Sequence, residues 1–119
     1  MIDQNIQSSS PLSASEIKMI EDTKLSVLER HHLRVLAHCL ACFKDMANGF
    51  NEGSLPNQEN RLKWCLAQPS LSKDQSFIPV LLDQFAGAAR QLETVANELG
   101  ISPLELTLRD LIQKVTLQN

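Results

Sequence analysis

The residues from Ser13 to Asn48 form a stretch with no proline and no glycine, in which apolar residues recur at helical spacing throughout. The stretch opens with Ser13 and Glu16, which are spaced as a capping box. It is followed by Gly49, the residue type that most readily takes the left-handed conformation beyond a helix end. The pattern predicts one very long helix over residues 14–48, about 50 Å in length at 1.5 Å per residue. It leaves open whether this helix is straight or bent near Asp22, because the Asp22 side chain can bond to the backbone.

Two further helices are predicted by their end signals. A short helix is expected over residues 58–67, because Pro69 prevents its continuation. A third helix is expected over residues 79–99, where apolar residues keep unbroken 3-4 spacing. Pro79 suits a first turn, in which no backbone amide is missed, and Gly100 suits the end.

A fourth helix is predicted over residues 103–117. Ser102, Pro103 and Glu105 occupy the cap, first-turn and capping-box positions in the expected order. The alternation of apolar residues around Leu106 is also typical of a strand. The capping residues favour the helix, which would place Leu106 on its far face.

These elements predict an all-α protein, a bundle of about four helices with one very long N-terminal helix. A chain of 119 residues fits one domain, which we expect over residues 13–119. The polar residues 1–12 are expected to form a mobile tail.

Composition narrows the classes of function. The formal charge of −3 gives no general attraction to phosphate backbones or anionic lipid, and the chain has one tryptophan and no tyrosine for stacking on bases. No apolar run reaches the ~18 residues of a membrane span, and the first ten residues do not resemble a secretory leader. With three cysteines, an odd number, these features predict reduced thiols and a cytoplasmic location. No glycine-rich phosphate loop, nucleophile elbow or paired-histidine zinc motif is found, so neither an enzyme nor a cofactor is expected.

The predicted long helix exceeds the length of any partner helix in the chain. Its unmatched first part carries apolar residues that still need burial, and a symmetric dimer would cover them. The expected interface consists of Ile17, Ile20, Leu25, Leu28 and His32. The sequence therefore predicts a non-enzymatic helical interaction or adaptor protein that acts as a homodimer. If it has a further partner, we expect that partner to be another protein and not nucleic acid or a membrane.

A second interpretation is a metal site. His38, Cys39 and Cys42 lie at i, i+1 and i+4 of a predicted helix, and Cys65 would be a fourth ligand of tetrahedral zinc. The alternative is that the cysteines pack as small apolar residues, because Cys39 and Cys42 belong to an apolar stripe. Core packing is the interpretation that we favour.

The remaining interpretation, which ranks ahead of the metal site, is DNA binding. Ala96 to Leu111 resembles a helix-turn-helix motif, with Ala96, Gly100, Ile101 and Leu106 at characteristic positions. The resemblance implies a regulator whose cations on the last helix are Arg109 and Lys114. The first residues of that helix are apolar and acidic where base recognition needs Arg, Lys, Asn or Gln, so a tight helix–helix corner is favoured.

Overall fold

A computed structural model describes residues 12–118 of the chain. Within this range the protein is all-helical and contains no strand, so the predicted fold class is confirmed. The described α-helices are α2 (Ala14–Glu21), α3 (Val27–Met46), α4 (Gln58–Ala67), α5 (Pro69–Lys73), α6 (Ile78–Leu99) and α7 (Leu108–Gln118), with 3-10 turns η1 (Gln75–Phe77) and η2 (Pro103–Glu105).

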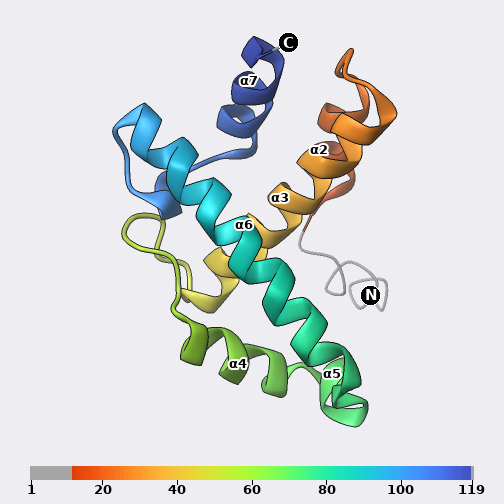
Figure 1. The fold of residues 1–119 in the computed structure, drawn as a ribbon, viewed down its shortest axis with the longest axis vertical. Coiled ribbons are helices and arrows are strands. Elements are labelled where there is room, and N and C mark those ends of the chain that lie inside the picture. The colour runs from red at the N-terminus through yellow and green to blue at the C-terminus, as the bar shows by residue number, and fades with distance from the viewer. Residues whose placement is uncertain (1–11, 119) are drawn as a thin grey trace.

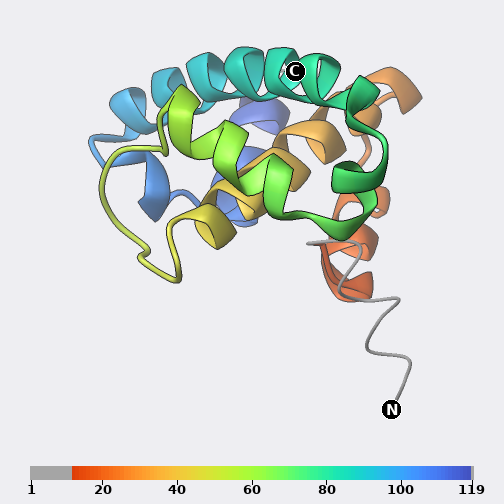
Figure 2. The ribbon, with the colours of Figure 1, turned by 90° about the horizontal axis from the view of Figure 1, so that it is seen from below.

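The centre of the fold is the crossing of α3 and α6 (Figure 1). Phe43 of α3 and Phe85 of α6 are fully buried there, with ring centroids 5.3 Å apart. Trp64 of α4 meets the Phe85 ring edge-on at 6.0 Å. Figure 2 shows α6 spanning the whole width of the molecule above α3 and α4. The aromatic residues therefore join the three helices into one apolar core.

The prediction of one helix over 14–48 is wrong. The chain leaves α2 at Asp22 and starts α3 at Val27, so the bend near Asp22 that the sequence left open is a complete break. Ser26 makes a new capping box: its hydroxyl accepts from the Glu29 amide at 3.1 Å, and its own amide donates to the Glu29 carboxylate at 3.0 Å. The break lets α2 fold back onto α3, which buries apolar side chains within the chain itself.

The two middle helices occur where they were predicted. α4 spans residues 58–67, and α6 begins one residue before the expected start at Pro79 and ends at Leu99. Gly100 has a φ of 73° in the left-handed region, as its role beyond a helix end requires. Pro69 does end α4, but it also begins the short helix α5, where only a connector was expected.

The prediction of one helix over 103–117 is also wrong. Pro103–Glu105 makes a single 3-10 turn, Leu106 is extended with φ −60° and ψ 144°, and α7 begins at Leu108. Thr107 and Asp110 cap α7, because the Thr107 amide donates to the Asp110 carboxylate at 2.9 Å and the Asp110 amide donates to the Thr107 hydroxyl at 3.2 Å. Leu106, expected on the far face, is instead fully buried.

The predicted tail of residues 1–12 lies outside the described residues except for Leu12, whose side chain is buried.

Among the described helices, none combines the length and the apolar character that crossing a membrane requires.

Candidate functional site around helix α3

Helix α3 is the central element of the candidate site. α2, α6 and α7 all pack against it. Two cavities lie beside α3. The one between α2, α3 and α7 is called the small cavity, and the one between α2, α3 and α6 is called the open cavity.

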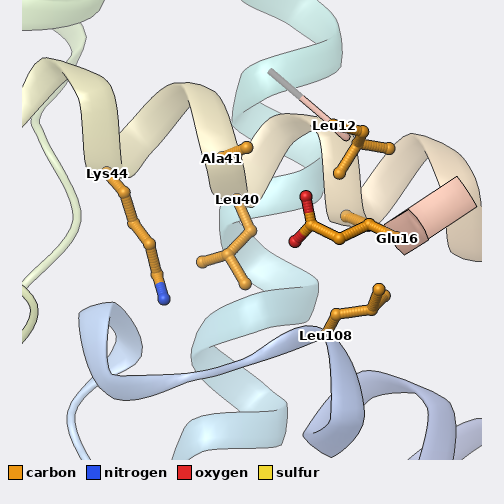
Figure 3. Close-up of a pocket in the computed structure, with 7 residues that line it drawn as sticks. Leu12, Glu16, Leu40, Ala41, Lys44 and Leu108 are labelled. Carbon is orange, nitrogen blue, oxygen red and sulfur yellow. The ribbon is translucent and has the colours of Figure 1, made fainter. Parts of the chain in front are cut away.

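The small cavity has a volume of about 70 Å³, which is far below the usual size of a site for a small organic ligand. Figure 3 shows that Glu16 from α2 and Lys44 from α3 both reach toward it, with Leu108 from α7 on the opposite wall. Its lining residues are Leu12, Glu16, Ala37, Leu40, Ala41, Lys44 and Leu108.

Lys44 connects α3 to the break before α7. Its ammonium group donates to the carbonyl oxygen of Leu106 at 2.5 Å. Burial lowers the pKa of Lys44, while the nearby carboxylates of Asp110 and Glu16 act in the opposite direction. Because Leu106 is extended, its carbonyl group lies outside any helix. Lys44 donates the hydrogen bond that a helix amide would otherwise donate to this carbonyl oxygen. This is a structural role.

The open cavity is larger, at about 250 Å³. Its floor is one side of α3, formed by His31, Arg34, Val35 and His38 at helical spacing. Its walls are Leu12 and Ile17 on one side and Gln84 of α6 on the other. Among the described residues that line it, two are histidines, one is an arginine and none is acidic.

Arg34 and His38, two polar groups of the open cavity, have partners within the chain. Arg34 forms an ion pair with Glu21 at the end of α2. His38 Nε2 lies 3.7 Å from Cys42 Sγ, and burial lowers the pKa of His38 below its usual value. His32, which follows His31 on α3, shares a hydrogen bond of 2.9 Å with the Gln91 side chain of α6. The cavity thus has a floor of imidazole and guanidinium groups, with the Arg34 charge paired to Glu21, and partly apolar walls.

The residues predicted for a dimer interface fall into two groups. Ile20 and Leu25 are 0% and 7% exposed, so the chain's own core already buries them and the reason for placing them in an interface no longer applies. Ile17 is 36% exposed, Leu28 is 76% exposed and His32 lies at the surface. An interface at these three residues stays a prediction.

The residues of the proposed metal site do not meet at one point. Cys39, Cys42 and Cys65 are all free and buried, and His38 is close to Cys42 only. Within residues 12–118, no three His, Cys, Asp or Glu side chains are placed to hold an ion together. Burial raises the pKa of Cys39 to about 11 and, with the charges of Cys39 and Asp45, that of Cys42 to about 12. Both thiols therefore stay protonated and unreactive near neutral pH.

The corner that resembles a helix-turn-helix motif has a different geometry. Gly100 ends α6, and the Ile101 amide donates to the carbonyl of Ala96 at 3.0 Å. The next element is the three-residue turn η2, so the described chain has no recognition helix at this position. Arg109 is exposed on α7, whereas Lys114 is paired with Glu98. The motif region is therefore the end of α6 and the connection over residues 100–107 that contains η2, so the favoured tight helix–helix corner is not found there.

These features define a class of protein: an all-α protein whose central helix α3 is covered by α2, α6 and α7. A partly open cavity lined by histidine and arginine side chains lies beside α3, between α2 and α6. The chain belongs to the family described as NDH complex assembly factor CRR9, whose model matches residues 12–119. No curated protein and no solved structure matches the chain.

The residues of the open cavity were not found from the sequence. His31, Arg34 and His38 have the spacing of one helix side, but only His38 stood out in the sequence, as a candidate zinc ligand. The available signal was the clustering of all three histidines of the chain, with Arg30 and Arg34, within nine residues of a chain with net negative charge. Such a cluster indicates a basic surface, but it does not show which neighbouring helices enclose it.

Proposed function

We propose that this protein is a non-enzymatic assembly factor that binds a protein of the NDH complex while the complex is being built. The observation that carries the proposal is the family match over residues 12–119, which includes every described residue. An assembly factor acts by binding and releasing partners, so its function lies in its surface rather than in bond-making groups.

The surface around α3 supports this proposal. Val27 and Leu28, at the first turn of α3, are 75% and 76% exposed, and Val80 of α6 is 67% exposed. Large apolar side chains at such exposure, together with a cavity between them, are typical of a protein-binding surface. A homodimer that uses Leu28 is a second candidate, and a cytoplasmic location remains part of the proposal.

The test is deletion of the gene, followed by native gel separation of the NDH complex. We expect the deletion strain to contain much less of the finished complex and to accumulate incomplete forms. Re-expression of the full chain should restore the finished complex, and the tagged chain should migrate with incomplete forms only. Normal amounts of finished complex in the deletion strain would overturn the proposal.

A further inference from the structure

The described part of the chain begins at Leu12, and this residue borders the open cavity. The Leu12 side chain is 8% exposed and forms part of the cavity wall together with Ile17. In Figure 3 the same side chain lies against α3, near Glu16. Residues 1–11, which lie outside the described residues, are joined to the fold through Leu12. They therefore enter the molecule at the edge of the open cavity.

The size of the open cavity suits a side chain better than a whole small molecule. Its volume of about 250 Å³ lies below the roughly 300–1,000 Å³ of small-molecule sites, whereas a cavity of about 150 Å³ already holds a benzene-sized group. Three of its described lining side chains, those of Leu12, Ile17 and Val35, are apolar. One apolar side chain with a few neighbouring backbone groups fits this space.

The polar lining of the open cavity suits an uncharged occupant. Among the lining residues that the structure describes, Arg34 carries a full charge, and its ion pair with Glu21 already neutralises that charge. His31, His38 and Gln84 present imidazole and amide groups, which donate and accept hydrogen bonds. Burial lowers the pKa of His38, which favours the neutral ring. Such groups are suitable partners for the amides and carbonyls of a peptide segment, which need hydrogen bonds when they leave water.

The composition of residues 1–11 matches this lining. Asp3 carries the one charged side chain of the segment, and the other side chains are amides, hydroxyls and apolar groups, including those of Ile2 and Ile6. Ile6 precedes Leu12 by six residues, a length of chain that spans at most about 20 Å. Ile6 can therefore reach the cavity that Leu12 borders. The intervening residues 8–11 are serines and a proline, which are typical of turns and suit a reversal of the chain.

We propose that the open cavity binds the chain's own segment 1–11, with the Ile6 side chain inserted among Leu12, Ile17 and Val35. A short tether gives an effective concentration on the order of millimolar, so weak contacts are enough to hold the segment in the cavity. The docking does not depend on the proposed assembly function. Where that function holds, a partner that uses the cavity competes with residues 1–11, and the segment regulates access to the site.

The tether favours the chain's own segment over the same segment of a second copy. A second copy that inserts its Ile6 loses translational and rotational freedom on binding, whereas an attached segment has lost that freedom already. The intrachain form therefore dominates at protein concentrations below the effective concentration of the tethered segment.

The first experiment traps the docked segment in the purified full chain that carries the substitutions Ile6→Cys and Gln84→Cys. The native cysteines do not compete for the new thiols, because all three are buried and burial raises the pKa of Cys39 to about 11 and that of Cys42 to about 12. With oxidised glutathione as the oxidant, we expect an intrachain disulfide to form about ten-fold faster than in a control that combines Ile6→Cys with Gln113→Cys on the exposed side of α7. Equal rates, or a disulfide that forms only between two chains, would overturn the inference.

The second experiment uses the histidine signals in the NMR spectrum of the purified chain and adds no bond. Ile6→Ser should change the chemical shifts of the ring protons of His31 and His38, which line the cavity. It should leave those of His32 unchanged, because His32 is not among the lining residues. The matched control is Gln4→Ser, which alters the same segment without removing an apolar side chain and should leave all three histidines unchanged.

Unchanged signals of His31 and His38 in Ile6→Ser would overturn the inference, as would equal changes in Ile6→Ser and Gln4→Ser. Both experiments use the purified chain alone. Their failure would leave the proposed assembly function standing, because that function is tested separately by deletion of the gene.

Discussion

The two cavities beside α3 differ in volume and in the residues that line them. On the α7 side, Leu40 and Leu111 are almost fully buried and Lys44 bonds across to the Leu106 carbonyl. On the side between α2 and α6, the described residues leave a floor of imidazole and guanidinium groups and exposed apolar neighbours in contact with solvent. The same helix thus serves as core on one side and as accessible surface on the other. Substitutions on the first side should change the free energy of unfolding, whereas those on the second should change binding.

The largest expected effect compares one chemical change on both sides of α3. Leu40→Ala should lower the free energy of unfolding by about 2–5 kcal/mol, because it leaves a cavity in a packed core. Leu28→Ala, at a side chain that is 76% exposed, should change it by less than about 0.5 kcal/mol. Urea unfolding of the two variants and the parent measures both values. Equal losses would show that the two sides are not distinct.

A smaller effect is expected at Lys44. Lys44→Met keeps most of the aliphatic length but removes the donor to the Leu106 carbonyl, and an unpaired buried acceptor costs about 1–3 kcal/mol. Lys44→Arg, which keeps a donor, should lose less. If Lys44→Met is as stable as the parent, the hydrogen bond does not hold the break before α7 in place.

The sequence predicted those helix ends that no tertiary contact can override. Gly100 takes the left-handed conformation, and Pro69 lacks the amide that would continue α4, so α4 and α6 occur where they were expected. Both wrong helix predictions concern breaks inside regular apolar patterns. The pairs Ser26–Glu29 and Thr107–Asp110 have capping spacing and were visible in the sequence. The break before α7 also involves a distant contact, since the Leu106 carbonyl accepts from Lys44, 62 residues away.

The candidate site was less predictable than the fold, for a related reason. Helical spacing places His31, Arg34 and His38 on one side of α3 whatever surrounds them. Whether that side is solvent, core or cavity depends on where α2 and α6 pack, and α2 packs beside α3 only because the chain breaks before Ser26. Because the sequence analysis missed this one helix end, it assigned the apolar residues of α2 to a dimer interface. In the structure, part of this surface packs within the chain and a cavity lies beside it.

The smallest expected effect concerns this break. Ser26→Ala removes the hydroxyl that accepts from the Glu29 amide and should lower the free energy of unfolding by about 1 kcal/mol. Ser26→Asp, which keeps a good capping acceptor, should restore most of it. Because the cap fixes where α3 begins, amide hydrogen exchange in its first turn should accelerate in Ser26→Ala, while exchange around Phe43 should follow only the change in global stability. Unchanged exchange at the Glu29 and Arg30 amides, which donate to Ser26, would mean that packing of α2, rather than the cap, determines the start of α3. In that case the exposed first turn beside the open cavity is held in place by Ile20 and Leu25, and loosening the α2 contacts should affect partner binding more than removing the cap.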